Sequence, residues 1–297
     1  MADQAQSILD RLKAKSKQSN VSFQIILQLF FQEEFLRRLA QSQYANRFIL
    51  KGGLLLYGLT NFSSRPTVDM DFLIQRLSNE EALMKEIISE IISQNNDFIL
   101  LEMEHIKSIS EHRIYHGLRF QMVGKLKRTS TPFDIDLGVG DVIVPKPVPF
   151  SYPTQIDGFD SPLIIGYSLE SVIAEKFDAI LERMSYTSRM KDFFDIYDLS
   201  IRYSFDGRVL QEAITETLRN RRRIYEKHSM QVIESFQSDA LMKSKWVNFC
   251  KTIQINLPFH VVIGHIITFL GPIFLVILNE DEFFGEWTID EKWKVNK

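Results

Sequence analysis

Two aspartates separated by one residue, inside an apolar segment, most restrict what this chain can fold into. Asp69 and Asp71 lie in the run 65–74 (RPTVDMDFLI), which follows the pair Gly52-Gly53 at the end of an earlier apolar run. Side chains two residues apart in a strand point to the same face, which puts the Cα atoms of the two aspartates roughly 7 Å apart. Carboxylates directed at one point need a cation between them, commonly Mg²⁺ with a phosphate co-ligand. The pattern therefore predicts a metal–phosphate site for phosphoryl or nucleotidyl transfer.

A second pair of alternating aspartates, Asp134 and Asp136, lies in the segment 133–144, which we expect to be a strand. If this strand neighbours the strand of Asp69 and Asp71, three carboxylates share one face, which is enough for two Mg²⁺ ions. One pair of this kind is often only a solvated polar face. Two pairs in one lobe favour a metal site of Asp69, Asp71 and Asp136, although alternation alone does not choose between Asp134 and Asp136 as the third carboxylate.

The alternation of helix and strand patterns predicts an α+β protein with two lobes. We expect a mixed-sheet lobe over residues 1–150, a proline-rich linker over 151–165 and a helical lobe over 166–297. In the first lobe, helices are predicted over 22–42, from the Gly52-Gly53 pair to 59, and over 78–94, the last with a capping box of Ser78 and Glu81. Strands of this lobe are predicted over 67–75, 98–105, 113–123 and 133–144. In the second lobe, helices are predicted over 168–184, 190–203, 207–227, 229–237 and 241–251, with two more near the end.

Composition gives no sign of an export or membrane protein. The formal net charge of −3 over 297 residues gives no general attraction to nucleic acid, and the single Cys250 excludes an intrachain disulfide and fits a cytoplasmic protein. The polar N-terminus lacks the apolar core of a signal peptide. The segment 257–278 contains no Asp, Glu, Lys or Arg, but we expect a buried helix pair broken at Gly271-Pro272 rather than a membrane span.

Two charged residues of the helical lobe fall on apolar helix faces. Lys176 lies within the apolar stripe of the helix over 168–184, whereas Glu175, Asp178 and Glu182 lie on the opposite side. Such a lysine either extends its amine to solvent or binds an anion, for which a triphosphate would serve. Asp192 shares a stripe of the next helix with apolar residues, so its charge also needs a partner.

Two further polar clusters carry weaker signals. Four arginines, Arg219, Arg221, Arg222 and Arg223, could bind an RNA backbone, or could form a solvated helix face. The histidines at 112 and 116 have the spacing of a helical zinc site, but the surrounding residues are typical of a strand, which would separate them by about 13 Å. We therefore expect no zinc.

The motifs together resemble the AbiEii/AbiGii family of toxins, members of the nucleotidyltransferase superfamily with a polymerase-β-like core. The resemblance spans roughly residues 20–275, with a longer separation between Gly53 and Asp69 than in many nucleotidyltransferases, and with Gly53 where many relatives carry serine. The matching segments are Lys51-Gly52-Gly53, Arg65-x-Thr67-x-Asp69-x-Asp71, Ile135-Asp136-x-Gly138-x-Gly140-Asp141, Ala174-Glu175-Lys176 and Ser188-Arg189-Met190-Lys191-Asp192-Phe193-x-Asp195.

The resemblance implies a mechanism and a set of catalytic residues. Asp69, Asp71 and Asp136 would bind Mg²⁺, two ions during turnover, with an NTP as substrate. The nucleotide-binding residues would be Lys51, Gly52, Gly53, Arg65, Thr67 and Lys176. Lys176 would neutralise the triphosphate as pyrophosphate leaves, and Asp192 would act as a base, an orienting residue or an ion-pair partner. Arg65 could equally be a structural surface charge.

For the family, the resemblance implies a cytoplasmic toxin of a toxin–antitoxin or phage-defence system. Some relatives add nucleotides to the tRNA 3′ end, so tRNA is the expected acceptor, with a cognate antitoxin that need not bind the toxin. Three alternatives remain open: transfer to a small molecule such as an antibiotic, metal-dependent phosphodiester hydrolysis, and a non-catalytic nucleotide-binding or interaction module.

Overall fold

The computed structural model describes residues 2–93, 98–109, 117–222, 225, 227–290 and 292–295. The chain forms two compact units, Met1–Asp141 with Pro147–Tyr167 (unit 1) and Val142–Lys146 with Ser168–Lys297 (unit 2). These units differ from the expected boundaries at 150 and 165. Part of the expected linker forms strands of the unit 1 sheet, and the short segment Val142–Lys146 groups with unit 2.

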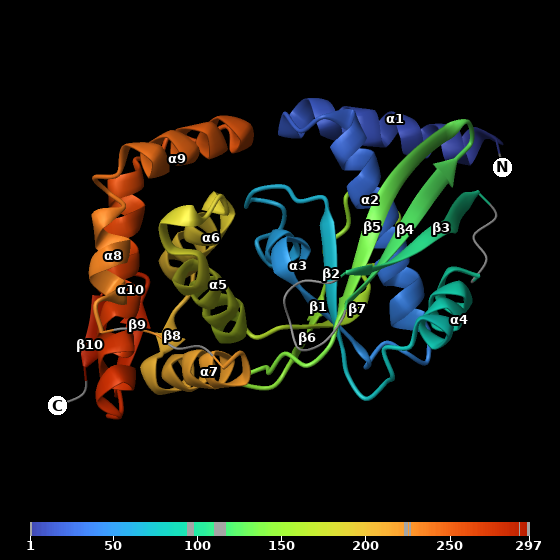
Figure 1. The fold of residues 1–297 in the computed structure, drawn as a ribbon. Helices are drawn as coiled ribbons and strands as arrows, with labels where there is room; N and C mark the ends of the chain where they lie inside the picture. The colour runs from blue at the N-terminus through green and yellow to red at the C-terminus, as the bar shows by residue number, and fades with distance from the viewer. Residues whose placement is uncertain are drawn as a thin grey trace. The chain divides into compact units, whose positions relative to one another are not determined.

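Unit 1 is a mixed sheet with helices packed on it, as expected for an α+β protein (Figure 1). The sheet has the strand order β3-β4-β5-β2-β1-β7-β6. Its elements are α1 (Ala2–Ser19), α2 (Phe23–Gln41), β1 (Phe48–Lys51), α3 (Gly52–Leu59), β2 (Asp69–Ile74), α4 (Glu81–Ile92), β3 (Ile99–Ile109), β4 (Gly117–Leu126), β5 (Thr129–Gly138), β6 (Val148–Ser151) and β7 (Leu163–Gly166).

Alternation along the central strands gives this sheet one apolar and one charged face. In β2, Met70 and Phe72 are buried, whereas the neighbouring aspartates are partly or fully exposed. Helix α2 packs on the apolar face so closely that a Cβ on Gly124 of β4 would lie 2.1 Å from the ring of Phe31. The apolar side chains of β2, β4 and β5 are thereby buried, and the polar side chains are left on the opposite face.

Unit 1 contains helix α1, which was not predicted, and differs from the sequence predictions at two further places. The capping box was wrong: α4 begins at Glu81, its N-cap Glu80 makes no side-chain cap bond, and the Ser78 hydroxyl accepts a hydrogen bond from the Glu80 N–H instead. The strand expected over 133–144 begins at Thr129 and ends at Gly138, and residues 139–144 belong to no strand. Both differences lie at element boundaries, where local signals are weakest.

Unit 2 is mainly helical and carries a small antiparallel sheet of order β10-β9-β8. Its elements are α5 (Leu169–Arg183), a 3₁₀ turn (Met184–Tyr186), α6 (Met190–Arg202), β8 (Phe205–Asp206), α7 (Gly207–Asn220), α8 (Ser229–Ser235), α9 (Ala240–Ile253), α10 (Phe259–Asn279), β9 (Gly285–Thr288) and β10 (Lys292–Val295). Trp287 of β9 is fully buried, and its ring contacts Phe269 of α10, with centroids 4.7 Å apart.

The expected break at Gly271-Pro272 was wrong, because α10 continues through Pro272. Proline removes one helical hydrogen bond, but buried apolar residues on both sides, including Leu270 and Ile273, keep the two halves packed as one helix. Within the described residues, α10 is the one helix long and apolar enough to cross a membrane, and half of its most apolar stretch is buried inside the protein.

Candidate active site

Four carboxylates lie in register on the charged face of the unit 1 sheet. Strands β2 and β5 are parallel neighbours, and their pairing sets Asp69 opposite Asp134 and Asp71 opposite Asp136. Directly paired residues share a face of the sheet, so the alternation within each strand becomes a two-by-two array of carboxylates. Such an array concentrates negative charge at one place.

Arg119 of β4 partly neutralises this array. It pairs across the antiparallel β4–β5 register with Asp136 and donates two hydrogen bonds to that carboxylate, Nε to Oδ1 at 2.7 Å and Nη2 to Oδ2 at 2.6 Å. Its Nη1 lies 3.7 Å from Asp134. The hydrogen bonds to Asp136, with smaller contributions from the charges of Asp136, Asp134 and Asp69, raise the pKa of Arg119 above its ordinary value. One guanidinium therefore pairs with Asp136 and lies close to Asp134.

The Gly52-Gly53 turn lies against the same carboxylates. Gly52 has φ +70, and a Cβ on it would lie 2.4 Å from Oδ2 of Asp71. A Cβ on Gly53 would lie 2.7 Å from Oγ1 of Thr67, which is buried and accepts a hydrogen bond from the Asp69 N–H at 3.3 Å. Only glycine allows this left-handed turn so close to the Asp71 side chain. The N-terminus of α3, with its unpaired backbone N–H groups, thereby begins beside the carboxylates.

Positive side chains flank the array along one line across the sheet. Consecutive strand registers connect Lys51, Asp71, Asp136, Arg119 and Lys107. The Lys51 ammonium lies 2.7 Å from Oδ2 of Asp141 and 5.3 Å from the Tyr167 ring centroid. Along this line one lysine is followed by two aspartates, and these are followed by an arginine and a second lysine.

The other two expected catalytic residues form a buried ion cluster in unit 2. Nζ of Lys176 lies 2.5 Å from Oδ2 of Asp195 and 3.4 Å from Oδ1 of Asp192. Arg189 donates to Oδ2 of Asp192 at 2.7 Å. Lys176 is 8% exposed, and both aspartates are 1% exposed. The cluster has two cations for two carboxylates, and is thus internally compensated.

A search of curated protein sequences found no match. The family model for the nucleotidyl transferase AbiEii toxin of type IV toxin–antitoxin systems matches residues 34–259, which is most of the chain. The chain belongs to the AbiEii nucleotidyltransferase toxin family. Nucleotidyl transfer is therefore its general chemistry.

Two solved structures are similar to this AbiEii-family chain, and one of them reaches a TM-score that indicates a common fold. The Helicobacter pylori protein JHP933 is 16% identical, with a TM-score of 0.50, over 87% of this chain and 98% of its own. A candidate nucleotidyltransferase from H. pylori is 15% identical, with a TM-score of 0.48, over 87% of this chain and 96% of its own. At such identity the likeness shows a common fold only.

The carboxylate array of this AbiEii-family chain suits a divalent cation in its chemistry. Carboxylate oxygens are the hard ligands that Mg²⁺ prefers, and Gly52 leaves the Asp71 side chain the room that a Cβ would fill. In the ranges that the structure describes, no group of three or more His, Cys, Asp or Glu side chains has the spacing of a metal site, and Asp136 is paired with Arg119. Asp69 and Asp71 are thus the candidate ligands, with Asp136 as a third that now holds a guanidinium.

Two of the four arginines of the predicted basic cluster for RNA, Arg219 and Arg221, form ion pairs within the protein. Arg221 is mostly buried and donates to Asp178 at 2.6 Å, with Glu175 at 3.3 Å, and Arg219 lies 2.5 Å from Glu216. Asp178, expected on the side of α5 opposite the apolar stripe, is fully buried by this pair. Arg223 and the two histidines considered for zinc lie outside the described residues.

Sequence reasoning missed Arg119, Asp195 as a partner of Lys176, and Asp141 as a partner of Lys51. Asp195 had a local signal, because it lies three residues after Asp192 and shares its face of α6. Arg119 had none, since only strand pairing brings it to Asp136. Arg65 is half-buried in the loop before β2.

Proposed function

We propose that this AbiEii-family enzyme transfers an NMP from an NTP to the 3′-terminal hydroxyl of a tRNA, with Mg²⁺ and with release of pyrophosphate. The observation that carries the proposal is the register of β2 and β5, which sets Asp69 and Asp71 beside Asp134 and Asp136 next to the Gly52 turn. A negative array beside the N-terminus of a helix suits a cation–triphosphate substrate and little else.

In this proposal each part of the charged face has a separate task. Asp69 and Asp71 would hold the ion that accompanies the NTP, and Asp136, now paired with Arg119, would be the third ligand. Bound Mg²⁺ would lower the pKa of the acceptor hydroxyl and stabilise the charge of the transition state. The acceptor oxygen forms a bond to the α-phosphorus, the bond to the pyrophosphate oxygen breaks, and the hydroxyl proton passes to a carboxylate or to solvent.

The backbone near Gly52 and Gly53 orients the phosphates. The first N–H groups of α3 have no partners within the helix, so they can donate to phosphate oxygens. Thr67 packs against Gly53 and fixes the chain before β2, which makes it a positioning residue. Lys51, already paired with Asp141, and Arg65 supply positive charge for the triphosphate in this proposal.

Lys176 and Asp192 complete the proposed set. An ammonium has three donors, and contacts with Asp195 and Asp192 account for two of them, which leaves one for a phosphate oxygen as pyrophosphate departs. Asp192 orients the lysine while Arg189 holds Asp192. The fixed charges lower the cost of reorganisation during transfer.

A tRNA acceptor is supported by the cations at the edge of the carboxylate array. Lys107 and Arg119 lie side by side on β3 and β4, on the charged face, where a phosphate backbone can contact them. We further propose that the enzyme acts in the cytoplasm as the toxin of a phage-defence system, restrained by a cognate antitoxin.

The test is incubation of the purified chain with each α-labelled NTP, Mg²⁺ and total RNA. We expect label on tRNA, a loss of about a thousandfold in Asp71→Ala, and wild-type transfer in Glu104→Gln, an exposed carboxylate of β3. Comparison of Asp134→Asn with Asp136→Asn identifies the third carboxylate. If the label appears on small molecules and not on RNA, the acceptor is a small molecule such as an antibiotic and not tRNA. Label transfer unaffected by Asp71→Ala would overturn the assignment of the site.

A further inference from the structure

Helix α2 contains a buried group of charges that nucleotidyl transfer does not use. Glu33 and Glu34 lie three to five residues before Arg37 and Arg38 on this helix. Each of the four side chains is at most 8% exposed. Arg38 is fully engaged: Nε binds Glu34 at 2.9 Å, and its two terminal nitrogens donate to the carbonyls of residues 92 and 99 at 2.5 and 2.7 Å. A helix does not need four buried charges for stability, since apolar residues would serve as well or better.

Arg37 is not fully engaged. Its Nε donates to Glu34 at 3.0 Å and its Nη1 donates to Glu33, but within the described parts of the chain Nη2 has no hydrogen-bond partner. Arg11 of α1 donates from Nη1 to the carbonyl of Asp157 at 2.6 Å, and its buried Nε likewise lacks a partner there. A buried donor of a charged group that lacks an acceptor destabilises the protein, so two such donors at one place indicate an acceptor from outside.

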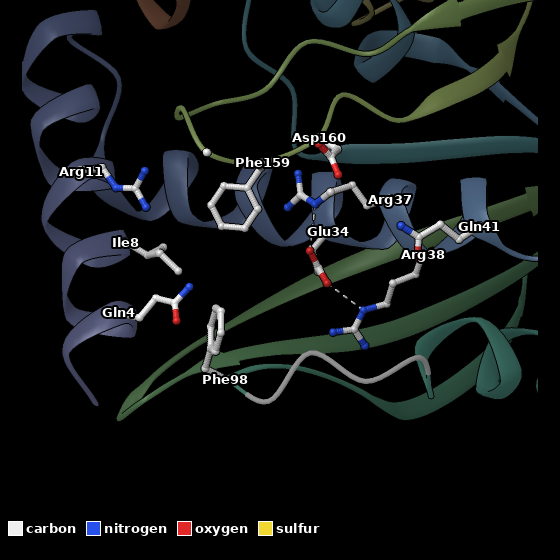
Figure 2. A pocket seen from close by; sticks show the side chains of 11 residues that line it. Gln4, Ile8, Arg11, Glu34, Arg37, Arg38, Gln41, Phe98, Phe159 and Asp160 are labelled. Atoms are coloured by element: carbon white, nitrogen blue, oxygen red, sulfur yellow. Dashed lines mark hydrogen bonds and ion pairs between the residues drawn. The ribbon is translucent and has the colours of Figure 1, made fainter. Parts of the chain in front are cut away.

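The arginines line one cavity of about 380 Å³, shown in Figure 2. Three guanidinium groups, those of Arg11, Arg37 and Arg38, line it against the two carboxylates of Glu34 and Asp160. The volume lies within the range of sites for small molecules, about 300–1,000 Å³. The charge balance of the lining favours a ligand that carries at least one negative charge.

Two aromatic rings give the same cavity a planar, apolar wall. Phe98 and Phe159 contribute to its lining, and the guanidinium carbon of Arg37 lies 4.6 Å from the Phe159 ring centroid. This stacking holds the guanidinium in place before any ligand binds, which lowers the entropic cost of binding. Aromatic rings beside guanidinium groups are the combination that binds planar ring systems bearing an oxyanion.

We infer that this cavity, bounded by α1, α2 and the loop of Phe159, binds a small organic oxyanion that carries a planar ring, at a site separate from the carboxylate array. The oxyanion accepts hydrogen bonds from Arg37 and Arg11, and the ring packs on Phe98 and Phe159. Helix α2 packs on the apolar face of the sheet, whereas the carboxylates lie on the other face. The chemistry is common to ring-bearing phosphates, such as a nucleoside monophosphate, and to aromatic carboxylates.

Isothermal titration of the full chain with four probes tests this inference. The probes are adenosine 5′-monophosphate, benzoate, adenosine and inorganic phosphate, each without divalent cations. We expect one of the two ring-bearing oxyanions to bind with an affinity at least about tenfold above adenosine and phosphate, and which of the two binds tells phosphate from carboxylate. The same titration in Asp71→Ala should be unchanged, so that the result does not depend on the proposed transferase site.

Two variants and one control locate the binding. Arg11→Gln should weaken binding about tenfold, and Phe159→Leu should weaken only the ring-bearing probes, whereas Arg128→Gln, an exposed arginine of the same unit, should bind as the wild type does. Each variant is checked for folding by circular dichroism, and Phe159→Leu remains informative if Arg11→Gln does not fold. The inference is overturned if no probe binds at millimolar concentration. It is also overturned if folded Arg11→Gln and folded Phe159→Leu both bind the probes as the wild type does, or if Asp71→Ala loses binding.

Discussion

Two clusters of aspartates and cations in this protein differ in burial. In unit 1, the pairs Asp69–Asp134 and Asp71–Asp136 share the charged face of the sheet with Arg119, which is 41% exposed. In unit 2, the carboxylates of Asp192 and Asp195 are 1% exposed and pair with Lys176 and Arg189. The charges of the first cluster are therefore in contact with solvent, whereas the carboxylates of the second are buried.

The difference shows which cluster depends on a ligand and which supports the fold. Carboxylates that are partly exposed are screened by solvent, so their pairing contributes little to folding, and neighbouring carboxylates favour a bound cation. Buried ions that lose one partner are left uncompensated in a medium of low polarity, so their pairing matters to folding. The family's transfer chemistry therefore has its metal-binding candidates on the exposed array, and any role of Lys176 must be separated from its structural one.

Removal of one charge from each cluster should give opposite results for stability. Lys176→Ala should lower the free energy of unfolding by about 3–5 kcal/mol, because the buried carboxylates of Asp192 and Asp195 lose the ammonium that pairs with both of them. Asp71→Ala should change it by less than about 1 kcal/mol, because the Asp71 side chain is only partly buried and its charge is screened by solvent. Urea denaturation followed by circular dichroism measures both.

The control for this prediction removes the three buried charges of the unit 2 ion cluster and leaves the more exposed Arg189. Lys176→Met combined with Asp192→Asn and Asp195→Asn should recover most of the stability lost in Lys176→Ala, while transfer activity stays lost if Lys176 contacts the triphosphate. Equal losses of stability in Asp71→Ala and Lys176→Ala would remove the distinction between the two clusters.

The Gly52 turn should be sensitive in both stability and activity. Gly52→Ala forces an L side chain into a left-handed conformation and places its Cβ against the Asp71 carboxylate, so we expect a loss of about 1–3 kcal/mol and at least about a tenfold fall in transfer. Thermal unfolding and the labelled-NTP assay measure these. Gly264→Ala is the matched control: nothing lies within 4 Å of its added Cβ on α10, so stability should stay the same or rise by up to about 1 kcal/mol. Equal effects of both substitutions would show that Gly52 has no special role.

Glu33, a buried carboxyl group of unit 1, tests whether burial, rather than the unit in which a carboxyl group lies, decides how its charge affects stability. Burial raises the pKa of Glu33 from 4.5 to about 7, against the lowering effects of Arg37 and of the Gln155 N–H. Between pH 4.5 and 7 the Glu33 carboxyl group keeps its proton in the folded protein, whereas in the unfolded chain it has already lost that proton. Stability should therefore fall as the pH rises from about 4.5 to 7, by up to roughly 3 kcal/mol from this group.

Urea denaturation at several pH values measures that slope. Glu33→Gln should flatten it between pH 4.5 and 7, and Glu104→Gln should keep the wild-type slope. A wild-type slope in Glu33→Gln would mean that its ion pair with Arg37 outweighs its burial.

The smallest expected effect concerns Arg119. In the proposed function its guanidinium competes with Mg²⁺ for Asp136, so Arg119→Gln should lower the Mg²⁺ concentration for half-maximal transfer about two- to fivefold. Lys125→Gln is the matched control, because Lys125 lies on the same strand, is equally exposed and pairs with a carboxylate of β3. Mn²⁺ binding followed by electron paramagnetic resonance checks the affinity without turnover. A higher metal requirement in Arg119→Gln would instead show that Arg119 helps to hold the substrate.

Several parts of the fold and of the site followed from short-range patterns. The strands of Asp69 and Asp71 and of Asp136, the helix that begins at Gly52, and the apolar stripe that contains Lys176 were all predicted and found. These features depend on periodicities of two and 3.6 residues, which the chain carries locally. The matching family model confirms the resemblance carried by the same motifs.

Other features could not be read from neighbouring residues. The buried arginine at 221 looked like part of an exposed basic cluster, because its acidic partners on α5 are more than 40 residues away. The continuity of α10 through Pro272 likewise depends on packing around the proline rather than on its local preference.

The sequence by itself determined that Asp69 and Asp71 share one face of a strand and that a glycine turn precedes them, because backbone geometry fixes both. Only the tertiary structure decided that Asp136 lies beside Asp71, that Arg119 neutralises it, and that Lys176 is held by Asp195. Those pairings join residues from separate strands or helices, and the register of the sheet and the packing of α5 with α6 bring them together. The pairing and burial of charges are therefore properties of the fold, although each charge is a property of the sequence.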